Sequence, residues 1–307
     1  MICFVHPERS GGNTLHKILE NNSPFHIRLT PFYWPTSHLL TQSEAKWLFR
    51  VCPFAKSFGG HCVARHVRYE NVYLRPIHYV TMLREPIERY VAHYIHQRFG
   101  WGIDWTIDSF LNDEQFQNLM TKKICGSNDL EKAKYLIEEE FSFAGLTNQF
   151  DESLILMKHA LGQPDLQINY TRENVSPDPG KRDELLDNQR IRDAVAEMNE
   201  LDIELYRFVE NLFAQRKREY PTDLDEEVAR LRSDNLSFRF PPARMLIARA
   251  NRLWIKGPEM VLRKLHHSHE SVVWDGLKLR TQFLRRKPMQ IPRKRWIRES
   301  AEGIAKE

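Results

Sequence analysis

The stretch FVHPERSGGNTLHKI, residues 4–18, decides how this chain is expected to fold. It begins as an apolar run, passes through a proline, a basic residue and two glycines, and continues with the spacing of an amphipathic helix. A loop between a strand and a helix presents backbone N–H groups at the positive end of the helix dipole, which suits a phosphate or sulfate group. The stretch therefore predicts a first strand, an anion-binding loop and a helix.

The side chains of this loop add to the predicted anion site. Gly11 and Gly12 let the backbone curl around an anion without a Cβ clash. Arg9 carries a charged group that can contact two oxygens. The side chains that can donate to an anion are Arg9, Ser10, Asn13 and Thr14. A loop that binds ATP would need Lys where Asn13 stands, and a plain glycine-rich turn is the alternative when the loop is taken alone.

Repetition of the same pattern predicts the fold class. HYVTML, residues 78–83, is a second apolar run, and PIERYVAHYIHQRF continues it as a helix from residue 86. Further short strands are predicted at 141–147 and 166–171, and a long amphipathic helix is predicted over 188–220, ended by a proline. Strand, turn and helix in succession predict an α/β fold with a central parallel sheet flanked by helices.

Composition divides the chain and excludes some functions. We predict one domain over residues 1–218 and a basic, Trp-containing C-terminal extension over 219–307. A net charge of +4 on 307 residues is too small for a dedicated nucleic-acid-binding protein. The four cysteines are scattered without a CxxC pair, so neither a metal site nor a disulfide framework is expected. No run approaches the length of a transmembrane helix, and no signal peptide is predicted.

The C-terminal extension contains a strongly basic segment. Residues 276–298 carry nine Lys or Arg residues and no acidic residue. Such a run is typical of a solvated tail, and the alternative is peripheral contact with an anionic membrane surface or an acidic polymer.

A second segment, YVTMLREPIERYVAHY at residues 79–94, places charged residues where a strand is expected to end. Arg84 follows the predicted strand directly, at the edge where open α/β sheets bind ligands. The alternative is that Glu85, Glu88 and Arg89 simply form ion pairs on the surface of the following helix.

Taken together, the two segments resemble carbohydrate sulfotransferases of the heparan sulfate 2-O-sulfotransferase type. The first resembles their 5′-phosphosulfate loop, with Pro7 shifted by one place and Asn13 in place of a common Thr. The second resembles their 3′-phosphate segment LRDPVERFLSHY, with Ala92 in place of a Ser that donates to that phosphate. The resemblance covers about residues 2–214, including the stretch FAGLTNQFDESLILM at 143–157, and it does not cover the C-terminal extension.

The resemblance implies a function and a set of site residues. It implies that 3′-phosphoadenosine 5′-phosphosulfate (PAPS) donates a sulfuryl group to a hydroxyl of a carbohydrate or related acceptor, by in-line displacement and without a metal. The phosphosulfate loop (Arg9 to Thr14) and Arg84 would hold PAPS, and Arg9 would neutralise charge on the leaving phosphate. A Gly-His pair matches Gly60-His61, so His61 would be the general base. His66 is the alternative base, because the residues after it also match.

Two other functions and the location complete the expectations. A non-catalytic relative that binds nucleotide or an anionic glycan is one alternative, and a nucleotide kinase is a weaker one because the loop lacks Lys. Animal proteins with this pattern are usually anchored in the Golgi membrane. No such anchor precedes the first predicted strand here, so a soluble cytoplasmic enzyme is expected. The sequence makes no prediction of oligomeric state.

Overall fold

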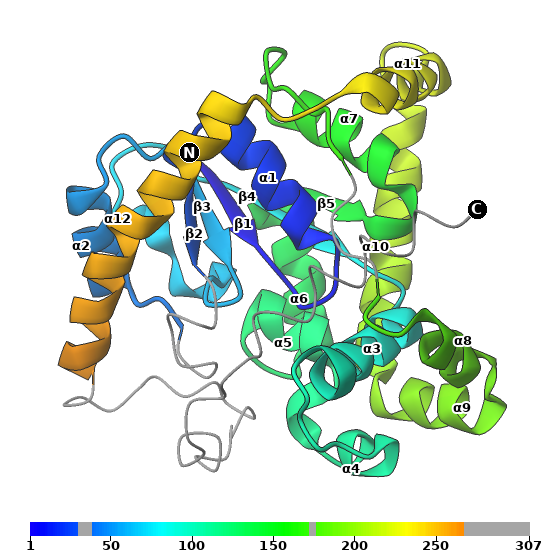
Figure 1. Ribbon diagram of the computed structural model, residues 1–307. Helices are drawn as coiled ribbons and strands as arrows, with labels where there is room; N and C mark the ends of the chain where they lie inside the picture. The colour runs from blue at the N-terminus through cyan, green and yellow to red at the C-terminus, as the bar shows by residue number, and fades with distance from the viewer. Residues whose placement is uncertain (30–38, 172–175, 267–307) are drawn as a thin grey trace, which may run out of the picture.

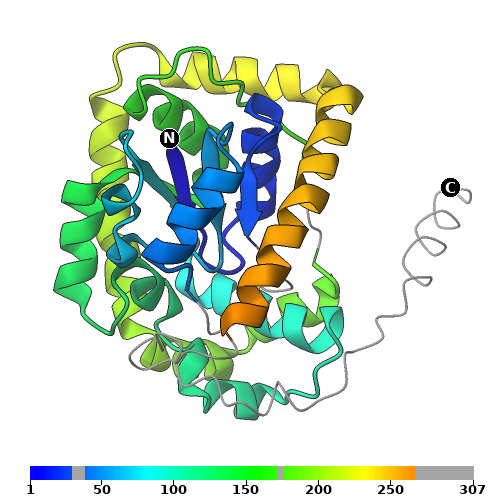
Figure 2. The same cartoon turned by 90° about the vertical axis from the view of Figure 1, so that its left-hand side faces the viewer.

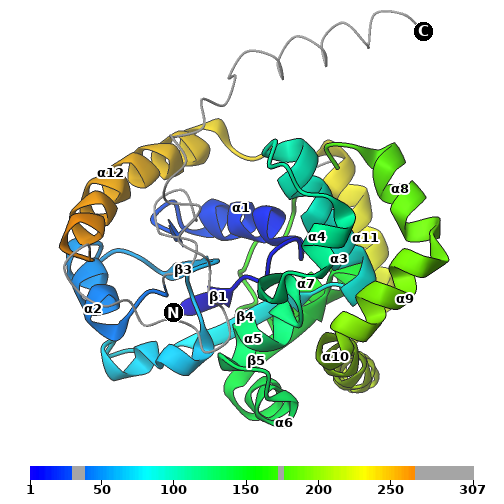
Figure 3. The same ribbon diagram turned by 90° about the horizontal axis from the view of Figure 1, so that it is seen from below.

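A five-stranded sheet forms the centre of the protein, with helices on both sides (Figures 1 and 3). The computed structural model describes residues 1–29, 39–171 and 176–266. The strands are β1 (Ile2–Val5), β2 (Ile27–Leu29), β3 (Ser57–Gly60), β4 (His78–Leu83) and β5 (Phe141–Leu146). They lie in the order β2-β3-β1-β4-β5, and every pairing is parallel. The predicted α/β fold with a central parallel sheet is confirmed.

The helices lie between the strands or follow β5, and only β3 and β4 are joined without an α-helix. Those of the described residues are α1 (Gly12–Asn22), α2 (Gln42–Val51), α3 (Pro86–Ile95), α4 (Ile107–Leu111), α5 (Leu119–Cys125), α6 (Leu130–Tyr135), α7 (Phe150–Ala160), α8 (Pro179–Asp187), α9 (Gln189–Met198), α10 (Glu200–Arg218), α11 (Leu224–Ser237) and α12 (Pro242–His266). Strand β1 is buried along its whole length, as its unbroken apolar sequence predicts for the middle of a parallel sheet.

The single long helix predicted over 188–220 is wrong, because the chain turns at Asn199 between α9 and α10. Asn199 leaves the helical region, with φ −129° and ψ 33°. Its side chain accepts from the backbone N–H of Asn118 at 3.0 Å and donates to the carbonyl of Val195 at 2.9 Å. A short polar side chain that bonds to nearby backbone competes with the helical hydrogen bonds, which explains the break.

The strand predicted at 166–171 is also wrong. This segment is extended, but side chains of helices satisfy its backbone in place of a neighbouring strand. The backbone N–H of Gln167 donates to Asn22 at 2.8 Å, and that of Tyr170 donates to Asn235 at 3.0 Å. Two strands, β2 and β3, were not predicted, because IRL is only three residues long and SFGG contains a single large apolar side chain.

Helices α11 and α12 complete the described part of the chain. The first packs on α7, and the second packs on α1, α2 and β2. Their buried residues Leu224, Val228, Leu231 and Ile255 belong to the same hydrophobic core as the sheet. The domain division at residue 218 stays a prediction. The basic segment at 276–298 lies outside the described residues.

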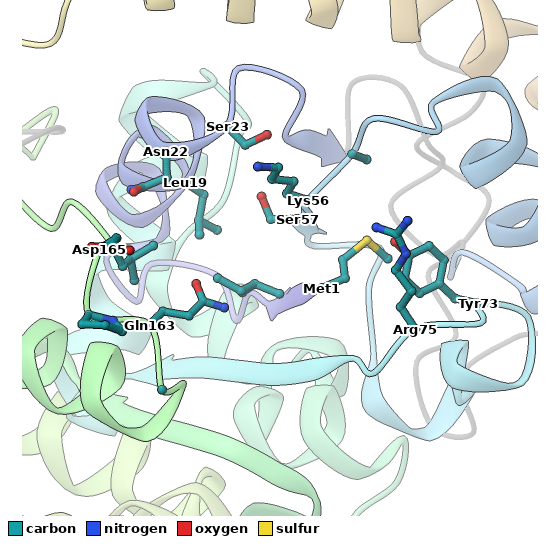
Figure 4. A pocket seen from close by; sticks show the side chains of 15 residues that line it. Met1, Leu19, Asn22, Ser23, Lys56, Ser57, Tyr73, Arg75, Gln163 and Asp165 are labelled. Atoms are coloured by element: carbon teal, nitrogen blue, oxygen red, sulfur yellow. The ribbon is translucent and has the colours of Figure 1, made fainter.

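The two ends of the sheet differ in what surrounds them. A pocket of about 530 Å³ opens at the amino ends of β1 and β3, where Met1, Lys56 and Ser57 line it (Figure 4). The residues predicted to bind an anion follow the opposite, carboxyl ends of β1 and β4. Since ligands in open α/β sheets bind beyond the carboxyl ends of the strands, the candidate site is sought there.

Candidate active site

The predicted anion-binding loop joins β1 to α1 in a tight conformation. Arg9 and Gly11 both adopt left-handed backbone angles, with φ 67° and φ 72°. The loop closes over the ring of His6, because a Cβ added at Gly12 would lie only 1.8 Å from the Nε2 of His6. The first turn of α1 therefore begins at a residue that has to be glycine, as the sequence predicts for a backbone curled at a helix N-terminus.

Two donors of this loop retain hydrogen-bonding capacity. The Oγ of Ser10 and the Nε of Arg9 are buried, and neither has a hydrogen-bond partner among the residues that the structure describes. Burial lowers the pKa of Arg9 to about 10, and Arg84 beside it adds to this shift. A bound anion would accept hydrogen bonds from the unused hydroxyl of Ser10 and would offset the like charges of the two neighbouring guanidinium groups.

Arg84 stands at the end of β4 and reaches the loop. Its Nη1 lies 3.5 Å from the carbonyl oxygen of Arg9, and its Nε and Nη2 donate to Glu88 at 3.2 and 3.1 Å. Pro86 opens α3 in its first turn, and the side chain of Glu85 accepts from two backbone N–H groups there. Ala92, which stands where the resembling segment has a Ser, is buried on α3.

The surface ion-pair alternative fails for Arg89. This side chain is fully buried, and its Nη2 lies 3.8 Å from the carboxylate of Asp202 on α10. Asp202 also accepts from the backbone N–H groups of Met120 and Thr121, at 3.0 and 2.8 Å. The ion pair connects α3 to α10, and the backbone bonds to Asp202 connect α10 to the start of α5.

Asn13 and Thr14 face the protein in this structure. The side-chain oxygen of Asn13 accepts a short hydrogen bond from Arg28 of β2, and Thr14 is mostly buried. Asn13 therefore holds a third cation, Arg28, near the loop. The sequence did not predict this contact.

His61 follows β3 and lies against the loop. Its Nδ1 is 3.0 Å from the carbonyl oxygen of His6, and its ring stacks on that of His6 with 4.1 Å between centroids. A carbonyl oxygen can only accept, so the Nδ1 of His61 carries the proton and the Nε2 keeps its lone pair. This is the tautomer that a general base needs.

Glu8 and Lys123 hold His61 in place, and the sequence did not single out either. The Nδ1 of His61 lies 3.5 Å from Glu8, and the Nζ of Lys123 donates to Glu8 at 3.1 Å and to the backbone carbonyl of His61 at 2.6 Å. Burial lowers the pKa of His61, and Glu8 opposes that shift. Burial also acts to raise the pKa of Glu8, but Lys123 and His61 outweigh it and bring this pKa down to about 2.

His66 lies on the short 3-10 turn Arg65–Val67, and its ring packs against Gly126 at the end of α5. Burial, followed by Lys132 and Lys123, lowers its pKa to about 4. Of the two histidines, His61 therefore contacts the segment between β1 and α1, through His6 and Glu8. The choice between the two histidines as base stays a prediction.

Three further histidines form a buried group beneath the loop, the histidine cluster (His6, His16 and His26). His16 and His26 share a hydrogen bond of 2.8 Å, and His26 contacts the hydroxyl of Ser57 at 2.8 Å. Burial, helped by Arg28, lowers the pKa of His26 to about 3, and burial also holds the pKa of His6 and His16 well below the usual range. The cluster is therefore neutral at neutral pH.

Comparison with curated proteins finds carbohydrate sulfotransferases. The chain is 24% identical over 304 residues to heparan-sulfate 6-O-sulfotransferase 1-B of Danio rerio, covering 78% of this chain and 72% of that protein. It is 24% identical to human heparan-sulfate 6-O-sulfotransferase 2 and 25% identical to human heparan-sulfate 6-O-sulfotransferase 3, covering 78% and 70% of this chain. The chain spans 48% and 58% of the lengths of these two human relatives. No protein-family model matches the chain.

These distant relatives support an enzyme of the carbohydrate sulfotransferase family, and they correct two expectations. The 2-O-sulfotransferase type is not specifically supported, because the relatives are 6-O-sulfotransferases. The cytoplasmic location is wrong, because heparan-sulfate 6-O-sulfotransferases are Golgi membrane enzymes that act on secreted glycans. Within the described residues, no helix is both long and apolar enough to cross a bilayer. No group of three or more potential metal ligands was found there either, and the expectation of a metal-free reaction stays a prediction.

Proposed function

We propose that this protein is a PAPS-dependent sulfotransferase that transfers a sulfuryl group to a hydroxyl of a carbohydrate acceptor. The observation that carries the proposal is the contact of the His61 Nδ1 with the carbonyl oxygen of His6, at the start of the loop that also holds the unpartnered Nε of Arg9 and Oγ of Ser10. This contact leaves the Nε2 of His61 as the nitrogen that can accept a proton. The distant relatives support the same reaction class and make a heparan-sulfate-type glycan the first acceptor to test.

Each residue has a distinct role in this proposal. PAPS supplies the sulfuryl group, and the backbone of the loop with Arg9 and Ser10 binds its 5′ end. Arg84 would leave Glu88 and bind the 3′-phosphate. The Nε2 of His61 would accept the proton of the acceptor hydroxyl as its oxygen bonds to sulfur and the bond from sulfur to the phosphate oxygen breaks. Arg9 would stabilise the charge that develops on that phosphate oxygen.

Glu8 and Lys123 would position the base. The carboxylate of Glu8 stabilises the imidazolium that forms on His61, and Lys123 holds both Glu8 and the backbone of His61. Glu8 would thus act as the third group that helps to orient the base.

The first experiment measures nucleotide binding. Calorimetric titration with 3′-phosphoadenosine 5′-phosphate should show binding, and Arg84→Ala should weaken it. Loss of one charge-assisted contact costs on the order of 1.5–3 kcal/mol, which is roughly a 10- to 150-fold change in Kd. Tighter binding of Mg-ATP than of this nucleotide would favour the kinase alternative, and failure to bind either would refute the proposal.

The second experiment measures sulfuryl transfer from PAPS to a panel of glycans that includes desulfated heparan. His61→Ala should abolish turnover and leave nucleotide binding unchanged, while His66→Ala should retain turnover. The opposite outcome would move the base to His66. Nucleotide binding with no transfer to any acceptor would support the non-catalytic alternative, which Ala92 favours because it removes a phosphate donor.

A further inference from the structure

Helix α12 carries apolar side chains on the side that faces away from the protein. We call Leu246, Ile247, Leu253 and Trp254 the outer face of α12. Leu246, Leu253 and Trp254 are 68%, 60% and 67% exposed. The two pairs are seven residues apart, which is about two helical turns, so all four project to one side. Figure 2 shows α12, coloured orange, along the outside of the fold.

The opposite side of α12 packs against the rest of the protein. Ala248 and Ile255 are buried against the protein, and α12 contacts α1, α2 and β2. Arg252 forms an ion pair with the buried Glu20 at 3.0 Å, and Asn251 donates to the backbone carbonyl of His26 at 3.2 Å. These contacts fix how the helix is rotated. The exposed leucine and tryptophan side chains are therefore held outward and contribute little to the core.

The segment that contains the outer face of α12 is also positively charged. The segment 235–258 contains no Asp or Glu, and its five basic residues are Arg239, Arg244, Arg249, Arg252 and Lys256. Arg252 is already paired with Glu20, and Arg244 donates to the backbone carbonyl of Asn21 at 2.6 Å. Arg249 is exposed and lies between the two apolar pairs in the sequence. A helix with Leu and Trp on one side and arginines beside them is typical of helices that lie in a membrane interface.

We propose that the outer face of α12 binds the surface of membranes that contain anionic phospholipids. A second copy of this chain is a poorer occupant, because two basic helices would meet with like charges. An acidic polysaccharide would satisfy the arginines but would leave Leu246, Leu253 and Trp254 in water. A lipid surface satisfies both, since its headgroups can pair with exposed arginines such as Arg249 and its acyl boundary takes the apolar side chains. The proposal does not depend on the sulfotransferase reaction.

Vesicle binding by the full chain tests this proposal. Vesicles of phosphatidylcholine alone are compared with vesicles that also contain phosphatidylglycerol, by co-sedimentation and by the blue shift of tryptophan fluorescence. The wild type should bind the anionic vesicles more tightly, and added salt should weaken the binding. The double variant Leu253→Gln, Trp254→Gln should lose about tenfold or more in affinity, because it removes two large apolar side chains from the interface.

Matched controls separate this surface from other sources of binding. Leu74→Gln changes a fully exposed leucine outside α12 and should leave vesicle affinity unchanged. Circular dichroism should show that the double variant is folded, as expected for exposed positions. Equal vesicle binding by the double variant and the wild type would overturn the proposal, and would move the binding to another part of the chain. A wild-type dimer that the double variant loses would also overturn it, in favour of self-association.

Discussion

Replacing Glu8 with Gln tests the group that we propose to position His61. Gln keeps the size and shape of the side chain and removes its charge. In the wild type, Glu8 lies 3.1 Å from the Nζ of Lys123 and 3.5 Å from the Nδ1 of His61. The side chain of Lys123 is almost fully buried, so the variant removes a carboxylate charge that this ammonium group contacts inside the protein.

The size of the effect follows from the pKa of Glu8. Its fall from the ordinary 4.5 to about 2 corresponds to roughly 3 kcal/mol of stability, at about 1.36 kcal/mol per pKa unit. Because the folded-state pKa is the lower one, this stability is fully present above the unfolded-state pKa and is lost only as the pH falls through the acid range. We therefore expect Glu8→Gln to lower the free energy of unfolding by about 3 kcal/mol, and by the same amount from about pH 6 to pH 8.

Urea unfolding followed by circular dichroism measures this loss. Glu131→Gln is the matched control, because Glu131 contacts Lys134 at 2.8 Å but is largely exposed. An exposed pair of this kind contributes little, so the control should lose much less stability. If the two variants lost the same stability, the inferred strength of the Glu8–Lys123 contact would be refuted.

The same variant has a second, independent readout in the pH dependence of transfer. Glu8 raises the pKa of His61 against the effect of burial, so Glu8→Gln should lower that pKa further. A base has to be deprotonated to act, and the acid limb of kcat/KM should move to lower pH. An acid limb that stays in place, in a variant that has lost the expected stability, would mean that Glu8 supports the fold without positioning the base.

Three further predictions concern the residues around the loop. Gly12→Ala places a Cβ within 1.8 Å of the His6 ring. The variant should lose on the order of 1–3 kcal/mol in the free energy of unfolding and should bind nucleotide more weakly. Wild-type values in urea unfolding and in calorimetry would contradict the packing described here. Asp202→Asn removes the anion beside the fully buried Arg89. The free energy of unfolding in urea should fall by about 3–5 kcal/mol. A fall as small as that of Glu131→Gln would contradict this prediction. The histidine cluster should make the protein less stable as the pH drops below the ordinary histidine pKa of 6.5. The reason is that the unfolded chain takes up protons that the folded cluster does not. The free energy of unfolding should fall with a limiting slope of roughly 1.4 kcal/mol per pH unit for each histidine. Thermal melts across this range measure the effect, and a melting temperature independent of pH would rule it out.

Local sequence predicted the elements that hold the candidate site. The apolar run at the N-terminus and HYVTML became β1 and β4, and helices follow both where glycine and proline mark their starts. These elements have strong local signals, because burial in a parallel sheet requires continuous apolar residues and because helix starts favour particular residues. Elements with weak local signals, such as the short strands β2 and β3, were missed. Residues 166–171 have a strand-like composition, but no strand of the described residues pairs with them.

The sequence by itself determined the strand-loop-helix unit at residues 2–22 and the cationic character of its loop, since both depend on residues that are adjacent in the chain. The tertiary structure alone decided what surrounds that loop. Lys123 reaches Glu8 from 115 positions away along the chain, and Arg28 reaches Asn13 from a different strand. Only the parallel sheet, which gathers the carboxyl ends of β1, β3 and β4 at one edge, brings His61 against His6 at the start of the candidate anion-binding loop.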